Sequence, residues 1–262
     1  MRRYLRLYVY FVQQRFKILM EYRINFLIGS VSTVFQQGAW LLAIWVVMRQ
    51  IPNMQGWSFP EVLLIYGLVT LAQSLNHMFA DNLWTIGWAY IRSGQFDRFL
   101  VRPIDPLFHL LADRFCHDGI GHFAVGAALV AGASAAIGLV WTPLKVLYLV
   151  VAVLSGGAIF VSLNLLTATT AFWIIESIPI TQIVFNQHEF AKYPLSIYHR
   201  GIQFLLTWIV PYGFASFYPA SYLLGRNVGP LAWLGPVVAA LLLGVSYRVW
   251  QFGLRYYSGT GS

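Results

Sequence analysis

Six long apolar stretches fill most of this 262-residue chain. A helix that crosses a bilayer core of about 30 Å requires about 20 consecutive apolar residues, so a chain with six such stretches is expected to cross a membrane repeatedly. Charged residues make up 10% of the sequence, against about 25% in soluble domains. The predicted spans are Ile24–Met48, Val62–Trp84, Ile120–Val140, Leu144–Ile175, Ile202–Leu224 and Leu231–Trp250.

The basic residues predict the orientation of these spans, because Lys and Arg near span ends stay on the cytoplasmic side. With the N-terminus inside, 14 of the 17 Lys and Arg residues fall on cytoplasmic segments, and Arg49, Lys145 and Arg226 fall outside. Six spans return the C-terminus to the cytoplasm, in agreement with this bias. The net charge of +8 is therefore a signal of membrane topology, and no nucleic-acid partner is expected.

We predict an all-α polytopic membrane protein with one transmembrane domain, 1–262. Its parts are an N-terminal amphipathic interface helix (2–22), two spans (24–84), a cytoplasmic loop (85–119), two spans (120–175), a cytoplasmic segment (176–201), the last two spans with re-entrant pieces (202–252) and a cytoplasmic tail (253–262). The interface helix carries a basic stripe opposite an apolar face, which suits the membrane surface. The alternative is an ordinary cytoplasmic extension of the first span.

The loop 85–119 contains a short amphipathic turn that prolines terminate, since proline restricts the residue before it and cannot continue a helix. Such a turn can insert into a groove on a cytoplasmic partner; the alternative is a loop that merely reverses the chain. The candidate docking residues are Gly94, Phe96, Asp97, Arg98, Phe99, Leu100, Arg102 and Pro103.

Two later segments have different expected roles. The segment 176–201 is amphipathic, and its length predicts a second helix on the inner surface. The segment 202–252 carries four prolines, and helices broken at membrane depth require backbone partners from protein or water. We therefore predict a short fifth span followed by re-entrant helical pieces at the outer face.

The sequence lacks the common catalytic and nucleotide-binding motifs. Leu154–Ala158 nearly copies the LSGGQ element of ATP-binding cassette ATPases, but it lies in an apolar span and no G-x-x-x-x-G-K-[ST] phosphate loop occurs. No H-E-x-x-H or G-x-S-x-G motif occurs either. We predict no catalytic residue, no cofactor and no metal site in this chain.

One polar group lies close to a predicted span, at the cytoplasmic end of the second. It consists of Asn76, His77 and Asp81. Ionisable groups inside a membrane are functional candidates by default, and these three side chains are candidates to line a polar pathway. The alternative is hydrated polarity at a helix end.

Four stretches give the chain a resemblance to a known family. They are Glu21-Tyr22-Arg23 with Asn25-Phe26, Gly94–Pro103, Pro211–Ala215 with Tyr218-Pro219-Ala220, and the ending Gly253–Ser262. The chain resembles the ABC-2-type permease subunits of bacterial ATP-binding cassette exporters, including a subfamily of about this length. The resemblance runs from end to end, and the loop that contains Arg102-Pro103 is its most distinctive part.

The resemblance implies a coupling helix around Gly94–Pro103 that sits on a separate cytoplasmic ATPase dimer, which would hold ATP and magnesium. It also implies a second permease subunit, identical or related, and a location in the bacterial cytoplasmic membrane among its lipids. Phe96, Phe99 and Leu100 would fill the ATPase groove while Asp97, Arg98 and Arg102 fix its orientation. Re-entrant pieces with Pro211 and Pro219 would gate the outer end.

Two other classes remain open at this level. A secondary transporter normally has inverted repeats and ion-coupling carboxylates at the midplane, and the predicted span centres carry no charge. A membrane-embedded lipid-modifying enzyme requires a polar constellation, for which Asn76, His77 and Asp81 are the candidates. The cargo is not evident from the sequence.

Overall fold

The computed structural model describes residues 2–21, 23–50, 54–114, 116, 118–174 and 176–257. These residues form helices and turns, with an isolated bridge between Met54 and Trp57 and no β-strand among them. The predicted all-α class is confirmed. Residue 22 of the predicted interface helix, Ile175 of the predicted fourth span and residues 258–262 of the predicted tail lie outside the described residues.

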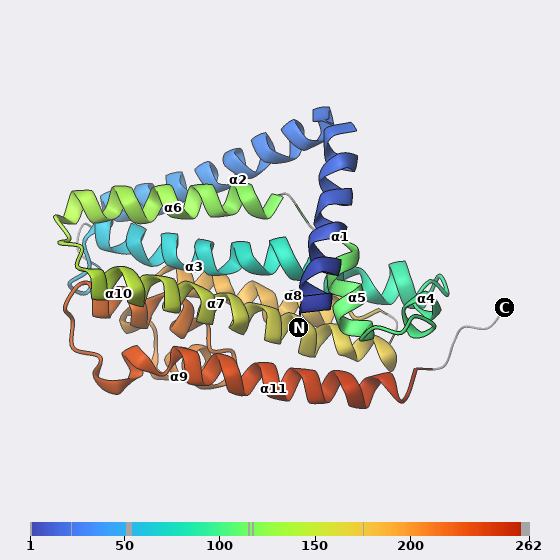
Figure 1. Ribbon diagram of the computed structural model, residues 1–262. Helices are drawn as coiled ribbons and strands as arrows, with labels where there is room; N and C mark the ends of the chain where they lie inside the picture. The colour runs from blue at the N-terminus through green and yellow to red at the C-terminus, as the bar shows by residue number, and fades with distance from the viewer. Residues whose placement is uncertain are drawn as a thin grey trace.

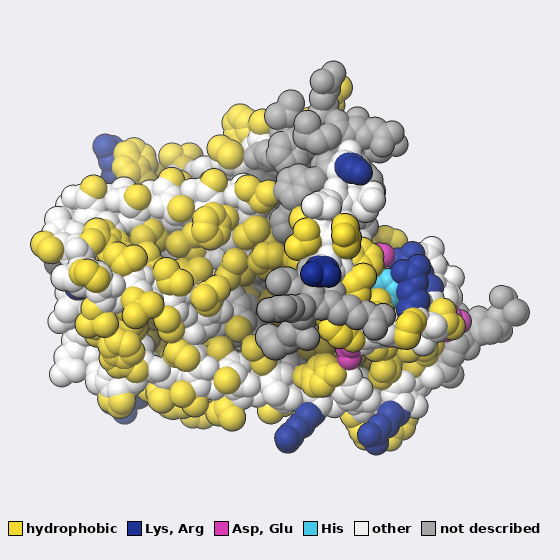
Figure 2. Space-filling view, viewed as in Figure 1, with side chains coloured by type: hydrophobic (Ala, Val, Ile, Leu, Met, Phe, Trp, Pro, Cys, Tyr) yellow, Lys and Arg dark blue, Asp and Glu magenta, His cyan; other side chains and the backbone are white. Residues whose placement is uncertain are grey.

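Long helices that run alongside one another form the body of the molecule (Figure 1). They are α2 (Arg23–Gln50), α3 (Phe59–Ala80), α6 (Asp118–Ile137), α7 (Pro143–Thr169) and α11 (Gly235–Leu254). The central helix α3 contacts both α6 and α7, and α11 packs on α7. On the face in Figure 2, hydrophobic side chains cover the long helices, and Lys and Arg lie mainly toward the end that carries α4 (Asp97–Leu100) and α5 (Pro106–Asp113).

Four helices in the described part of the chain are long and apolar enough to cross a membrane. They are Phe59–Ile91, Asp118–Ile137, Pro143–Phe172 and Gly235–Leu254, and they coincide with the predicted second, third, fourth and sixth spans. The first predicted span lies within α2, a continuous helix of 28 residues. Its passage through a membrane stays a prediction.

Small residues allow α3 and α6 to approach closely. A Cβ atom added to Gly126 would lie 2.9 Å from the backbone nitrogen of Leu71, and one added to Gly67 would lie 3.0 Å from the backbone nitrogen of Val130. Neither position has room for a larger residue. Gly126 and Gly67 therefore have the packing role that small residues have between membrane helices.

The helix α1 (Arg2–Glu21) runs across the long helices near the end that carries α4 and α5 (Figure 1). Tyr4 on α1 meets Phe108 on α5 edge to face, with ring centroids 4.8 Å apart. The predicted helix is confirmed. Its position on a membrane surface stays a prediction.

The segment 176–201 is not one helix, so the prediction of a single helix there is wrong, while its cytoplasmic location stays a prediction. It forms α8 (Ile178–Asn186) and two 3-10 turns, Gln187–Lys192 and Leu195–Ile197, which pack against α3 and α7. Phe185 contacts Trp84 beyond one end of α3, with ring centroids 4.9 Å apart. Ser196 accepts a hydrogen bond from Trp57 before the other end, at 3.0 Å. The segment therefore runs alongside α3 from one end toward the other.

The predicted fifth span, Ile202–Leu224, is not one helix, and that prediction is also wrong. The helix α9 (Arg200–Phe204) continues as a π-helical turn, Leu205–Ile209, and ends before Pro211. A 3-10 turn at Tyr212–Ala215, α10 (Phe217–Leu223) and a 3-10 turn at Gly229–Trp233 follow. Proline 211 lacks the amide hydrogen that would continue the helix. Short helical pieces are therefore present where they were predicted, and their re-entry into the membrane stays a prediction.

Candidate functional site

A cavity of about 310 Å³ lies between α2, α3, α6 and the segment that runs from α8 to Lys192. Most of its lining residues have polar side chains, although it lies among apolar helices. Such a site is costly in a membrane bundle and marks a functional candidate. The lining residues are Gln36, Gln37, Trp40, Gln73, His77, His122, Phe185, Asn186, His188, Glu189 and Lys192.

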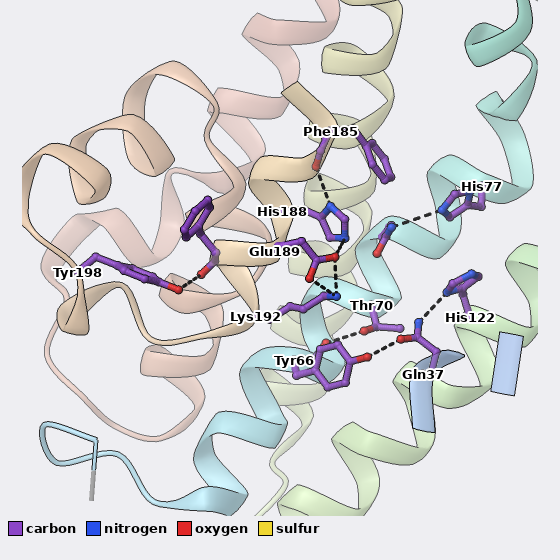
Figure 3. A network of polar contacts seen from close by, with 12 residues as sticks. Gln37, Tyr66, Thr70, His77, His122, Phe185, His188, Glu189, Lys192 and Tyr198 are labelled. Carbon is purple, nitrogen blue, oxygen red and sulfur yellow. Dashed lines mark hydrogen bonds and ion pairs between the residues drawn. The ribbon is translucent and has the colours of Figure 1, made fainter. Parts of the chain in front are cut away.

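The 3-10 segment Gln187–Lys192 brings an ion cluster to the cavity wall, which we define as His188, Glu189 and Lys192 (Figure 3). The Nζ atom of Lys192 donates to both carboxylate oxygens of Glu189, at 2.8 and 2.7 Å. The Nε2 atom of His188 lies 3.0 Å from the same carboxylate. The lysine side chain is 5% exposed and that of Glu189 is 34% exposed, so the carboxylate is the accessible member.

Aromatic rings enclose the ammonium group of Lys192 on its other sides. Its Nζ atom lies 4.1 Å from the ring centroid of Trp40 and 5.4 Å from that of Tyr66. Rings in this position stabilise a cation through their negative faces. The lysine is therefore held as a charged group inside the bundle.

A second polar chain crosses the cavity from α3 to α6. The Tyr66 hydroxyl donates to the amide oxygen of Gln37, whose nitrogen lies 2.8 Å from Nδ1 of His122. The His77 ring stacks on that of His122 with centroids 5.0 Å apart. Nδ1 of His77 faces Asp81 at 3.3 Å.

The three residues of the predicted polar group at the end of the second span do not lie together in the structure. His77 lines the cavity and contacts Asp81. Asn76 is buried on another face of α3, where its side-chain oxygen accepts a hydrogen bond from Asn164 at 3.2 Å. The residues Asn76 and His77 therefore belong to different environments, as expected for neighbours on a helix.

The predicted docking loop is a folded platform in which the two phenylalanines face inward. Phe96 and Phe99 are fully buried. Phe96 packs against Phe172 at the end of α7, against Trp250 on α11 and against Tyr257, with ring centroids between 4.9 and 6.2 Å apart. The expectation that Phe96 and Phe99 fill a groove on a partner is therefore wrong, because these rings already fill a groove in their own chain.

The charged residues of the loop hold the platform together. Arg98 pairs with Asp113 at 2.8 Å, and Arg102 lies 3.1 Å from His109. Asp97 accepts a hydrogen bond from the Tyr257 hydroxyl at 2.8 Å, and burial together with Asp97 raises the pKa of Tyr257 to about 12.

Burial and the neighbouring arginines lower the pKa of His109 from its usual value. The chain turns at Gly94, where φ is +71°. Leu100 to Pro103 form a continuous exposed edge of the platform, with Val101 81% exposed.

The predicted outer-gate prolines are both buried, Pro211 between α9 and α10 and Pro219 within α10. Those pieces are tied to the rest of the bundle by side chains. Thr207 and Tyr218 share a hydrogen bond of 2.9 Å, and the Ser216 hydroxyl donates to the carbonyl of Ala191 at 2.8 Å. Pro211 and Pro219 shape this packing, and their role as a gate stays a prediction.

Helices suited to a membrane, with a polar cavity inside their bundle, define a helical membrane transport protein as the class. Residues 18–261 match the family profile described as ABC-2 family transporter protein. The chain belongs to that family and is an ABC-2-type permease, and membership implies an ABC ATPase as partner. No curated protein and no solved structure gave a match.

Sequence reasoning missed most of the cavity. It placed Glu189 and Lys192 in a cytoplasmic segment, and on that basis treated the span centres as uncharged. The structure weakens this argument against a secondary transporter, because Lys192 and His188 are buried between the helices. One signal in the sequence could have revealed the buried ion pair. Glu189 and Lys192 are an acid and a base three residues apart, and on a helical turn such residues pair with each other and need no water.

Proposed function

We propose that this permease is one subunit of an exporter, that it forms half of a translocation path, and that a separate cytoplasmic ATPase drives it. Membership of the ABC-2 transporter family carries the proposal. The ATPase dimer would bind ATP and magnesium, and this chain would hold no cofactor and catalyse no reaction. The location we propose is the bacterial cytoplasmic membrane, with both chain ends in the cytoplasm.

The exposed edge of the platform, Leu100 to Pro103, is the surface that we propose docks on the ATPase. A movement of the platform would reach two long helices at once, because Phe96 contacts Phe172 beyond α7 and Trp250 on α11. Arg98 and Arg102 would set its orientation through their contacts with Asp113 and His109. Tilting of α7 and α11 would then change access to the path, with the pieces around Pro211 and Pro219 gating its outer end.

Transport requires that the cargo bind differently in the inward and outward states. The polar cavity beside α3 is where we propose this difference arises. A second permease, identical or related, would complete the path from the other side, and membrane lipid would surround both. His77 and Asp81 would belong to the path, while the buried Asn76 would contribute only to packing between α3 and α7.

The first test is a mild-detergent pull-down of the tagged chain, expressed with its chromosomal neighbours and followed by mass spectrometry. A stoichiometric ATPase, with or without a second permease, is the expected result. A Val101→Asp variant should lose the ATPase while it inserts normally, and Lys145→Met at the other end of the molecule should retain it. A chain that purifies without any ATPase contradicts the proposal.

The ion cluster favours one other function, that of a secondary transporter coupled to an ion. Such transporters hold their coupling ions near the midplane, and Glu189 is a partly exposed carboxylate on the wall of the cavity between the helices. Export from vesicles that contain no ATP separates the two. Our proposal predicts that export stops without ATP.

A further inference from the structure

A second cavity, of about 350 Å³, lies between α9, α10 and the 3-10 turns Leu195–Ile197 and Gly229–Trp233. Its volume is within the range of small-molecule sites. One face of α9 and of the π-helical turn that continues it lines the cavity at positions with the spacing i, i+3, i+4, i+7 and i+8 of a helix face. These positions are Arg200, Gln203, Phe204, Thr207 and Trp208. The wall therefore changes along this face from a charged group to an aromatic ring.

The charged end of this face lies near the end of the bundle that is opposite the platform. Ser196, which lines the cavity just before α9, accepts the hydrogen bond from Trp57 at the start of α3. Beyond the aromatic end of the face, Tyr212 stacks on Phe160 in the middle part of α7, with ring centroids 4.4 Å apart. The face therefore runs from the end of the bundle toward its middle, over about 12 Å for eight helical residues.

The positive charge of the cavity has no compensating carboxylate. None of the lining residues is acidic, and Arg200 forms no ion pair with any described residue. Arg226 at the same end of the bundle is different, because it pairs with Glu61 at 2.8 Å. A guanidinium group does not lose its proton in proteins, so this cavity is positively charged whatever the state of the histidines.

The neutral polar groups on the wall add hydrogen-bond donors to this charge. Ser196 accepts from the indole of Trp57, so its own hydroxyl proton remains to donate. Thr207 and Tyr218 share one hydrogen bond, which leaves one of their two hydroxyl protons. Gln203 donates one amide proton to a backbone carbonyl at 2.8 Å and carries a second. No described residue accepts these three protons, and the matching partner for them and a guanidinium is a phosphate or a carboxylate.

We propose that this cavity binds an amphipathic anion, with its phosphate or carboxylate group at Arg200 and its apolar chain along Phe204 and Trp208. Both rings are more than half exposed, and they lie nearer the middle of the bundle than Arg200. A charged group at the membrane surface with an apolar chain toward the interior is the orientation of a lipid in a bilayer. The assignment rests on the proposed function, which places the platform in the cytoplasm and this cavity at the outer side, where an exporter delivers its cargo.

The test uses the full chain in a neutral maltoside detergent and radiolabelled dodecyl phosphate as the probe. Arg200→Gln should weaken binding about fivefold, the upper value for loss of an exposed ion pair. Arg248→Gln is the matched control, because it removes the same charge from an exposed arginine on α11 that does not line the cavity. Arg200→Lys keeps the charge without the planar donor fork and should recover part of the affinity.

Two outcomes with these variants overturn the inference. Unchanged binding by Arg200→Gln shows that the guanidinium does not hold the anion. Equal losses in Arg200→Gln and Arg248→Gln show that the probe responds to the net charge of the chain and not to this cavity. Because both arginines are exposed, both variants should elute in size-exclusion chromatography as the unsubstituted chain does.

Competing ligands test the two halves of the anion separately. Dodecyltrimethylammonium has the same chain and the opposite charge and should not displace the probe; displacement equal to that by unlabelled dodecyl phosphate overturns the inference. Inorganic phosphate should compete only at much higher concentrations, and competition equal to that by dodecyl phosphate identifies a site for a small free anion and overturns the assignment to an amphipath. Trp208→Ala should weaken binding of dodecyl phosphate, and unchanged binding overturns the placement of the chain.

Failure of this inference and failure of the proposed function give different results. A chain that retains its ATPase in the pull-down but binds dodecyl phosphate independently of Arg200 loses only the anion site. A chain that binds dodecyl phosphate in the expected pattern without any ATPase loses the proposed function and retains the anion site.

Discussion

Two short segments of this chain have similar compositions and opposite structures. The platform residues Phe96 to Arg102 turn their phenylalanines inward and their charges toward the surface. The segment His188 to Lys192 turns Lys192 and His188 inward and leaves Phe190 40% exposed. In the platform the buried side chains are aromatic rings that pack on one another. In the cavity segment the buried side chains are polar, and they pair with Glu189.

The difference shows how a charged residue enters an apolar bundle. Lys192 has a carboxylate at 2.7 Å and the face of Trp40 at 4.1 Å, so it is compensated without water. Arg98 has a carboxylate at 2.8 Å as well, but its side chain is 44% exposed. Arg98 also lies over the rings of Phe99 and Tyr90, at 4.8 and 5.6 Å from their centroids. Neither the ion pair nor an aromatic neighbour therefore decides by itself whether a charged side chain is buried.

The largest effect is expected in the platform. Phe99→Ala removes a fully buried ring and should destabilise the chain by about 3 kcal/mol, the lower part of the range for such truncations. Denaturant unfolding in mixed micelles measures this. Leu100→Ala, at the exposed neighbour, should change stability by less than about 0.5 kcal/mol. Equal effects of the two substitutions would show that the platform is not packed as described.

The next effect concerns the cavity segment. Lys192→Met leaves Glu189 and His188 as a pair and should cost about 2 kcal/mol, reduced from the value for a fully buried pair because Glu189 is partly exposed. The same unfolding measurement applies. Adding Glu189→Gln should restore part of the loss, since it removes the carboxylate that lost its partner. A double variant less stable than Lys192→Met argues against charge compensation.

A smaller effect is expected where the platform meets the end of the chain. Tyr257→Phe removes the hydrogen bond to Asp97 and should cost about 1 kcal/mol. The matched control is Tyr256→Phe, whose ring is 53% exposed. Hydrogen exchange of the platform amides should rise in the first variant and stay unchanged in the second. An equal rise in both would mean that Asp97 does not hold the chain end.

The smallest effect is a pH dependence of the platform. The pKa of His109 lies below its usual value, chiefly because of burial and secondly because of Arg102. As pH falls below about 6.5 the unfolded chain binds this proton first, so the stability present at higher pH decreases. His109→Gln should remove that part of the decrease in melting temperature between about pH 7 and pH 5. An unchanged profile contradicts the assignment to His109.

The sequence predicted those parts of the fold in which apolar residues face lipid or the core and charged residues face water. Apolar runs of sufficient length predicted four helices suited to crossing a membrane, and Arg102-Pro103 marked the platform. Segment 176–201 was misplaced because its charges are satisfied by each other, as Lys192 and Glu189 show, so they did not require solvent. The bounds 202–224 of the fifth span ran through Pro211, although the four prolines of 202–252 predicted the broken helices that the structure shows.

The site was predicted less completely than the fold. His77 was identified because it lies in an apolar span, whereas Gln37, His122 and Lys192 come from three other elements and converge only in space. Phe96 and Phe99 were assigned to a partner because an amphipathic turn has an apolar face, and a sequence does not show whether that face is covered by its own chain. Trp250 and Phe172 cover it.

The central claim is that the exposed edge of the platform contacts an ATPase. Cysteine cross-linking tests this directly in a Cys116→Ala background, since Cys116 is the one cysteine of the sequence. Val101→Cys should cross-link to the co-purified ATPase in membranes, and Trp141→Cys, exposed at the opposite end of the bundle, should not. A complex that forms normally while Val101→Cys gives no cross-link, or one in which both positions react equally, would contradict the account.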